Sequence, residues 1–290
     1  MSEYVIMTDS SCDLPAKLAE EMELTVLPLY VDVDGQKYTN YLDEREISFA
    51  EIYAKLRTKC PAKTSAVNMN DFLEPMEESL KAGMDILYIG FSSGLSGTYN
   101  AGVMAAQELS EKYPERKILT ADSLCASMGQ GLLVYLAWQQ KQQGKSIEEV
   151  RDFVEQTKLH LCHWFTIDDL MFLKRGGRIS GATAIVGSML SIKPVMHVDN
   201  EGHLIKVDTA RGRKASIRAL ANKAGQLGID LANQVIFISH GDCLEDANYL
   251  AGIMRSRFNV KDVVISYVGP VIGAHSGPGT VALFFLGTER

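Results

Sequence analysis

The stretch DILYIGFSSGLSGTYNAGVMAAQELSEKY, residues 85–113, places a polar loop between a buried strand and a helix. Residues 85–91 form a continuous apolar run, which is typical of a strand buried on both faces. Residues 99–113 repeat apolar side chains at the spacing of a helix. Because a strand followed directly by a helix is half of a βαβ unit, the stretch predicts a parallel sheet covered by helices.

The alternation of strands and helices continues on both sides of this stretch. Short apolar runs predict further strands: 4–9, 24–35 and 117–122. Helical spacing predicts further helices: 13–22, 49–57, 69–83, 127–144 and 146–158. We expect Asp13 to cap the first of these helices, with Pro15 in its first turn. Ser146 and Glu149 form a capping box at the start of the last one.

The sequence pattern changes near residue 160. An apolar helix of small residues is predicted over 180–192, ending before Pro194. Residues 194–210 alternate apolar and polar side chains around the turn Asn200-Glu201-Gly202, which indicates a hairpin. Strands and helices alternate again towards the end of the chain. The fold class is therefore α/β with two domains: 1–160 with a parallel sheet between two helical layers, and 161–290 with a mixed sheet.

Composition restricts the partners and the compartment. The 290-residue chain has 29 basic and 36 acidic side chains, a net charge of −7, which argues against nucleic-acid binding. Its five cysteines are scattered without a CxxC pair, which favours reduced thiols and a cytoplasmic location. No apolar stretch approaches the length of a membrane span, so we expect no stable membrane insertion, and transient membrane contact stays open. His160 and His163 are too weak a pair to predict a metal site.

Four polar loops follow or precede predicted elements, and they are the first candidates for a ligand site: 8–13, 63–68, 92–98 and 122–127. In open parallel sheets, ligands bind beyond the carboxyl ends of the strands. Hydroxyl groups and the N–H groups at helix starts favour an anionic ligand group, and glycines let the backbone approach it. The candidates are Asp9, Ser10, Ser93, Gly94, Ser96 and Gly97. Asp9, Ser10 and Asp122 have the alternative role of forming turns and helix caps.

Two further stretches stand apart from the strand and helix pattern. In YVGPVIGAHSGPGTVAL, residues 267–283, four glycines including Gly273 and two prolines surround His275, so we expect an irregular loop that directs the imidazole at a ligand. In KRGGRIS, residues 174–180, three cations precede a predicted helix start, where the helix dipole disfavours them. Lys174, Arg175 and Arg178 therefore serve either an external anion or partner, or a solvated turn.

Six stretches of the sequence closely resemble the DegV family, whose members include the fatty-acid-binding subunits of bacterial fatty acid kinase. The stretches are TDSSCDL (8–14), KTS (63–65), SSGLSGTY (92–99), DSLCASMGQG (122–131), LKRGGRIS (173–180) and VGPVIGAHSGPG (268–279). They occur in the family's order and cover nearly the whole chain. The sequence departs from the family pattern at Ala66-Val67, where Gln-Pro often follows the Thr-Ser pair.

The resemblance implies a non-enzymatic carrier that holds one long-chain fatty acid, such as palmitate or oleate, in a tunnel between its domains. The family's carboxylate-binding groups fall on Thr64, Ser65, Ser93 and His275. Arg175 falls at the docking surface for the separate kinase subunit. No cofactor is implied, and the helix 180–192 is the first candidate for a tunnel wall.

Two other functions remain open from the residues alone. A subunit of the dihydroxyacetone kinase type would use His275 or His240 to capture a carbonyl. A serine hydrolase would use Ser92 or Ser93, which stand in a G-x-S-x-G outline. A regulatory protein that senses fatty acid would use the same pocket as the carrier.

Overall fold

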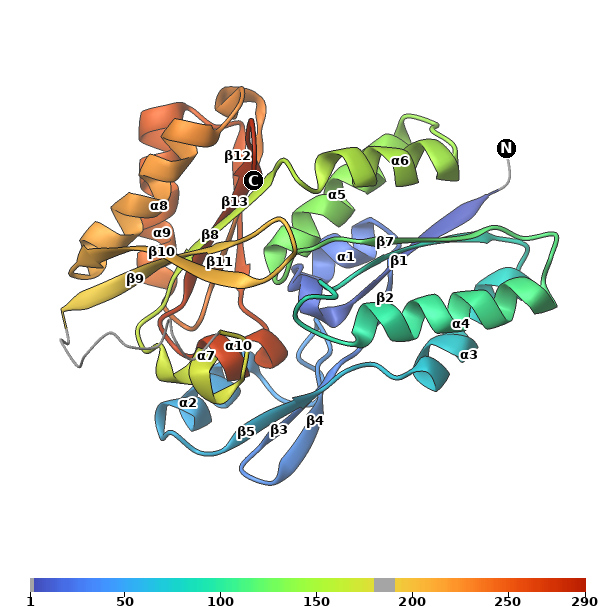
Figure 1. Cartoon of the computed structure of the whole chain (residues 1–290), viewed down its shortest axis with the longest axis horizontal. Coiled ribbons are helices and arrows are strands. Elements are labelled where there is room, and N and C mark those ends of the chain that lie inside the picture. The colour runs from blue at the N-terminus through green and yellow to red at the C-terminus, as the bar shows by residue number, and fades with distance from the viewer. Residues whose placement is uncertain (1–2, 180–190) are drawn as a thin grey trace.

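The computed structural model describes residues 3–179 and 191–290, and Figure 1 shows two sheets side by side. The first sheet has the order β2-β1-β6-β7, and all of its neighbouring strands are parallel. Its strands are β1 (Tyr4–Asp9), β2 (Thr25–Leu27), β6 (Asp85–Gly90) and β7 (Ile118–Asp122). The predicted parallel sheet is confirmed.

Helices cover both faces of this sheet. They are α1 (Ala16–Glu21), α3 (Met69–Lys81), α4 (Thr98–Lys112), α5 (Met128–Gln142) and α6 (Ile147–Thr157). Along β6, Leu87 and Ile89 join the core that contains α1, α5 and α6, while Ile86 and Tyr88 join the core that contains α3 and α4. Successive side chains of a strand point to opposite faces, so an unbroken apolar run is what a sheet between two helical layers requires.

A small antiparallel sheet, absent from the sequence prediction, interrupts this arrangement. Its order is β4-β3-β5, with β3 (Tyr30–Val33), β4 (Gln36–Thr39) and β5 (Ala62–Ser65). The helix α2 (Phe49–Arg57) lies between β4 and β5 in the chain. The candidate residues Thr64 and Ser65 thus end a strand that pairs with β3, rather than standing in a loop before α3.

The second sheet is mixed, as predicted, with the order β10-β9-β8-β13-β11-β12. Its strands are β8 (Leu161–Thr166), β9 (Ile192–Val198), β10 (Leu204–Arg211), β11 (Val235–His240), β12 (Asp262–Tyr267) and β13 (Val281–Leu286). Only β11 and β12 run parallel, and β9 and β10 form the predicted hairpin. The last strand, β13, lies between β8 and β11 in the middle of the sheet.

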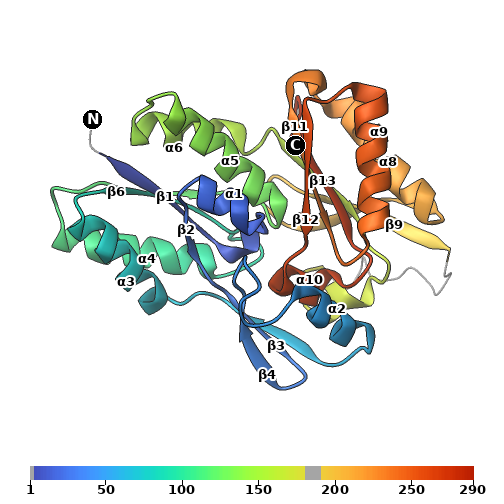
Figure 2. The same cartoon turned by 180° about the vertical axis from the view of Figure 1, so that it is seen from behind.

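Among the described residues, four α-helices accompany the second sheet: α7 (Met171–Arg175), α8 (Arg213–Leu227), α9 (Leu244–Phe258) and α10 (Pro270–Ser276). α8 and α9 cover one face. Figure 2 shows α10 and α2 close to the small sheet, and α10 also contacts α7.

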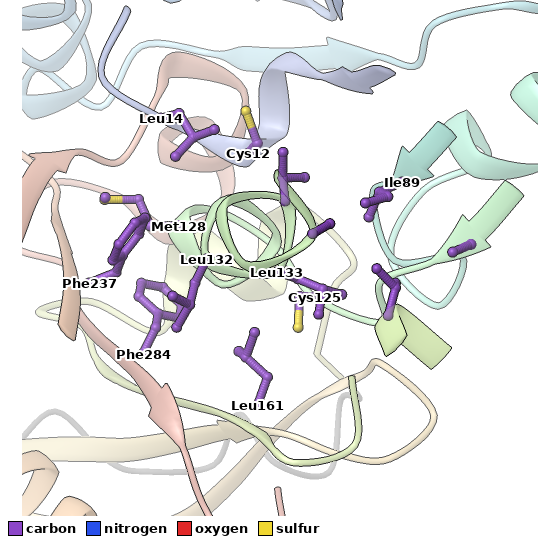
Figure 3. Packing of buried hydrophobic residues seen from close by; sticks show 14 of the residues in the cluster. Cys12, Leu14, Ile89, Cys125, Met128, Leu132, Leu133, Leu161, Phe237 and Phe284 are labelled. Atoms are coloured by element: carbon purple, nitrogen blue, oxygen red, sulfur yellow. The ribbon is translucent and has the colours of Figure 1, made fainter. Parts of the chain in front are cut away.

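The helix α5 fills the space between the two sheets. Figure 3 looks along it and shows Leu132 and Leu133 with side chains from both halves of the chain around them. Phe237 and Phe284 come from the second sheet, and Ile89 comes from the first. All are almost fully buried, so a single apolar core joins the two sheets.

Two sequence predictions need correction, and a third falls mainly outside the described residues. Asp13 does not cap α1, because it adopts a left-handed conformation (φ 51°) at the end of a 3-10 turn and its side chain accepts from Ser127. His275 lies in the helix α10, which begins at Pro270, and not in an irregular loop. The predicted helix 180–192 falls mainly outside the described residues, and at its end Ile192 already begins β9.

The domain boundary at residue 160 remains a prediction. It falls between α6 and β8, in agreement with the change from one sheet to the other. Within residues 3–179 and 191–290, no helix has both the length and the apolar character that a membrane crossing needs.

Candidate functional site

A cavity of about 150 Å³ lies between the two halves of the chain. Its walls are mainly apolar and include Phe91, Leu95, Phe165, Leu173, Val271 and Ile272. Two of these residues precede α5 and four follow α6, so neither half of the chain forms the cavity alone. A second, more open hollow of about 550 Å³ shares Leu95, Arg178 and Leu204 with it. The combined volume of the two spaces falls within the range of about 300–1,000 Å³ that ligand sites usually occupy, so they can hold a ligand that is longer than the first cavity.

One end of the cavity is polar. Thr64 Oγ1 lies 2.8 Å from His275 Nε2, which brings together two predicted residues 211 positions apart. Ser65, Ser96 and Arg178 line the same cavity. Neutral hydroxyl and imidazole groups beside one guanidinium form a suitable partner set for a carboxylate.

Two glycine-containing segments of the sequence meet at this end. A Cβ on Gly176 would overlap the His275 ring, so only glycine permits α7 and α10 to approach this closely. A Cβ on Gly277 would lie 2.5 Å from the Phe172 ring, and Gly277 has a φ of 79°. Gly176 of KRGGRI and Gly277 of HSGPG thus permit the close contact between α7 and α10 that positions His275.

His275 is held in its neutral form. Burial lowers its pKa to about 4, and the positive charge of Arg178 acts in the same direction. Its Nδ1 is buried and has no hydrogen-bond partner among the described residues. At neutral pH, His275 therefore acts as a hydrogen-bonding group while Arg178 supplies the positive charge.

Arg178 has a fixed position although its side chain is only half-buried. Its Nε donates to Leu95 O at 3.4 Å and its Nη1 donates to Gly176 O at 2.5 Å. Partial burial lowers its pKa, but an arginine remains charged at any physiological pH. The sequence predicts Arg178 as a docking residue, and the structure places it in the cavity wall.

The other predicted residues divide into supporting and exposed groups. Asp9 is fully buried and accepts from Phe91 N and from the Tyr88 hydroxyl, while Ser10 Oγ accepts from Leu29 N. Asp9 and Ser10 thus hold loops in place without lining the cavity. Burial raises the pKa of Asp9. Gly273 packs against the Tyr53 ring.

Within the SSGLSGT loop, the structure separates the two serine candidates. Ser96 and Gly97 line the cavity, whereas Ser93 and Gly94 do not. The Ser93 side chain is exposed, and its N–H points to the carboxylate of Asp122 at 3.3 Å. Asp122 therefore supports the loop and does not line the cavity. Lys174 and Arg175 are exposed at the end of α7.

Five polar residues that the sequence did not predict as ligand groups also line the cavity: Ser127, His163, Ser239, Ser276 and Thr280. Ser127 stands at the start of α5, in a loop that the sequence predicts as polar. Ser239 and His163 lie within strands that read as buried apolar runs, so only the sheet register reveals them.

The geometry argues against a serine hydrolase and against His240 as a carbonyl-capturing group, whereas His275 lines the cavity. Ser92 Oγ donates to Gly202 O, and no histidine among the described residues bonds to Ser92 or Ser93. His240 Nδ1 accepts from Cys243 N and does not line the cavity. No group of three or more metal-ligating side chains occurs in the part of the chain that the structure describes.

Comparison with known proteins identifies relatives along the whole chain. A family model described as an uncharacterised protein of the DegV family matches residues 3–288. A DegV domain-containing protein of Clostridium perfringens is 46% identical over 290 residues, covering 100% of this chain and 99% of the relative.

Solved structures agree with this match. A DegV lipid-binding protein from Thermotoga maritima superimposes with a TM-score of 0.88 at 28% identity, covering 99% of both chains. A DegV-family protein from Thermus thermophilus, described for its fatty acid binding, has a TM-score of 0.87 at 30% identity and covers 99% of this chain and 100% of its own. On fold, sequence and coverage, the chain belongs to the DegV family.

Proposed function

We propose that this protein binds one long-chain fatty acid and presents its carboxylate to a separate ATP-dependent kinase subunit. The observation that carries the proposal is the cavity itself, an apolar space with a guanidinium, an imidazole and hydroxyl groups at one end. The description of the Thermus thermophilus relative as fatty-acid binding supports it.

The tail supplies most of the affinity in this proposal. A saturated sixteen-carbon acid has about 14 methylenes, and burying each contributes about 0.8 kcal/mol, or roughly 11 kcal/mol before costs. Hydrogen bonds to a charged group add about 1.5–3 kcal/mol each, much of which offsets desolvation. Ordering the ligand subtracts several kcal/mol. The polar end therefore sets the orientation of the acid.

Arg178 makes the carboxylate the favoured head group. Thr64, Ser65, Ser96 and His275 contribute neutral hydrogen bonds. We include Ser96 because it lines the cavity. Ser93, which the sequence predicts, would reach the carboxylate only if the loop moved.

Native mass spectrometry followed by lipid extraction tests the binding step. We expect one fatty acid per chain, and we expect Arg178→Met to lose most of it. Arg218→Met, on the exposed surface of α8, is the matched control and should retain the acid. A purified protein that is empty and takes up neither palmitate nor oleate would refute the proposal.

The transfer step has a separate test. Arg175 is exposed on α7, next to the polar end of the cavity, and its guanidinium packs 4.7 Å from the centre of the Phe172 ring. With a fatty acid kinase subunit and ATP, the loaded protein should yield an acyl phosphate that hydroxylamine traps as a hydroxamate. Arg175→Glu should abolish the hydroxamate and leave the bound acid in place. Equal yields from wild type and variant would remove Arg175 from the docking surface.

A further inference from the structure

A second polar group lies in the same cavity, away from the head-group end. Ser127 and Ser239 line the cavity beside the small apolar residues Ala126 and Ala282. Ser127 Oγ is 2.5 Å from Asp13 Oδ2 and 2.9 Å from Ser239 Oγ. Asp13 is buried behind the two serines and does not line the cavity. The three side chains form a hydrogen-bonded chain that ends at the cavity wall.

The length of α10 gives the approximate separation of the two polar groups. At its start, a Cβ on Gly269 would lie 2.5 Å from Asp13 Oδ1. Six residues later, His275 contacts Thr64. With a rise of 1.5 Å per residue, the two ends of α10 are about 9 Å apart.

A hydrocarbon tail cannot form hydrogen bonds with this second polar group. The hydroxyls of Ser127 and Ser239 are paired with each other and with Asp13, but each can make a further hydrogen bond, which a tail of methylenes leaves unused. Ser127 also has a backbone conformation that is rare for residues other than glycine, with a φ of 53° and a ψ of −147°. Two further lining residues, Ser276 and His163, carry a buried polar atom that has no hydrogen-bond partner among the described residues.

The direction of the hydrogen bonds depends on the proton of Asp13. Burial outweighs the hydrogen bond from Ser127 and raises the pKa of Asp13 to about 8, so the protonated form predominates at pH 7 and the ionised form is a minor fraction. With Asp13 ionised, Ser127 donates to it, Ser239 donates to Ser127, and Ser239 can accept from a ligand. With Asp13 protonated, the chain can reverse and Ser239 can donate. A hydroxyl group matches both directions because it donates and accepts, whereas a keto oxygen matches only one.

We propose that the cavity selects fatty acids that carry a hydroxyl group near the middle of the chain, and that Ser239 recognises this hydroxyl. This assignment rests on the proposed function, since it takes the carboxylate to lie at Thr64, Arg178 and His275. An extended chain advances about 3.3–3.6 Å over three bonds, so about 9 Å corresponds to seven or eight bonds. The favoured hydroxyl is therefore near carbon 8 or 9.

Competition binding with a fluorescent fatty acid tests the assignment. The probes are stearate and stearates hydroxylated at carbon 3, 8, 9, 12 or 17. We expect the 8- or 9-hydroxy acid to bind roughly fivefold more tightly than stearate, and the other hydroxy acids to bind more weakly than stearate. Ser239→Ala should remove the preference, so that the 8- and 9-hydroxy acids bind no more tightly than stearate, and its thermal unfolding curve shows whether the variant is folded.

Ser216→Ala is the matched control, because Ser216 is a buried serine of α8 that donates to Arg213 O and does not line the cavity. It should keep the preference. If stearate binds but no hydroxyl position binds more tightly, or if Ser239→Ala keeps the preference, this assignment is wrong and the proposed function stands. If neither stearate nor any hydroxy acid binds, the proposed function itself fails.

Discussion

The packing around α5 and the polar end of the cavity lie in the same interface between the two halves of the chain, but they are built in opposite ways. Around α5, Leu133 and Phe284 are fully buried within one cluster of apolar side chains. At the polar end, Thr64 and Arg178 are partly exposed and come from a strand end and a loop. The first region holds the halves together, and the second leaves polar atoms accessible to a ligand.

Because of this difference, we expect that substitutions around α5 change stability and that substitutions at the polar end change ligand binding. Regular elements supply the core, because apolar burial is non-directional and additive over large surfaces. The end of β5, the loop after α7 and the short helix α10 supply the polar end, because a ligand site needs a few groups in defined positions.

The largest expected effect comes from truncating the core. Leu133→Ala leaves a cavity beside α5 and should lower the free energy of unfolding by about 2–5 kcal/mol, as measured by urea denaturation. Leu136→Ala, at a half-buried position on the same helix, should cost less. The folded fraction of Leu133→Ala should bind fatty acid with unchanged affinity. If the affinity fell together with the stability, the core and the polar end would not be independent.

The next effect concerns the charge at the polar end. Arg178→Met keeps the apolar stem but removes the cation, so affinity for a fatty acid should fall about 10- to 100-fold. Affinity for a fatty alcohol of equal length should stay within about twofold, because it has no charge to pair. A parallel loss for acid and alcohol would mean that Arg178 only shapes the wall.

The third prediction uses the pH dependence of stability. The folded pKa of His275 is about 4, below its ordinary value near 6.5, so its contribution is fully present above pH 6.5 and is lost as pH falls towards 4. Between pH 6.5 and pH 5 this loss is about 2 kcal/mol. His275→Gln should therefore lose about that much less stability than wild type over this range. The exposed His203→Gln should follow the wild type, and identical curves for all three proteins would contradict the prediction.

The smallest effect separates two serines of one loop. Ser96→Ala should weaken fatty acid binding about fivefold, the size of one neutral hydrogen bond. Ser93→Ala should change it by less than twofold, because Ser93 does not line the cavity. The reverse result would show that the loop rearranges when the acid binds and would restore the role of Ser93 predicted from the sequence.

The sequence was sufficient wherever periodicity carries the information. The apolar run of β6 and the capping box at Ser146 and Glu149 both predict what the structure contains. Asp13 was misread because a cap and a buried acceptor have the same local pattern, and only the contact with Ser127 distinguishes them. The segment around His275 differs from the predicted loop because Gly273 serves close packing against Tyr53 within α10, so a glycine at this position does not interrupt the helix.

The candidate site was partly predictable for a similar reason. Thr64 and His275 were recognisable by their residue types and motifs, although the hydrogen bond between them spans 211 positions. Ser239 could not be predicted from its neighbours in the sequence, because a single serine in an apolar strand is common in ordinary protein cores. Its role depends on β11 standing opposite α5, which is a property of the assembled fold.

The place of β13 has a consequence for how the chain is made. Residues 281–286 pair with both β8 and β11, so until they leave the ribosome the second sheet exists only as two unjoined parts. During that time one side of α5 lacks Phe284, and its apolar surface is open to solvent or to a chaperone. Closure of the cavity, which includes Ala282, must then wait until residues 281–286 have emerged. Before that point the nascent chain lacks the closed cavity that the proposed ligand requires.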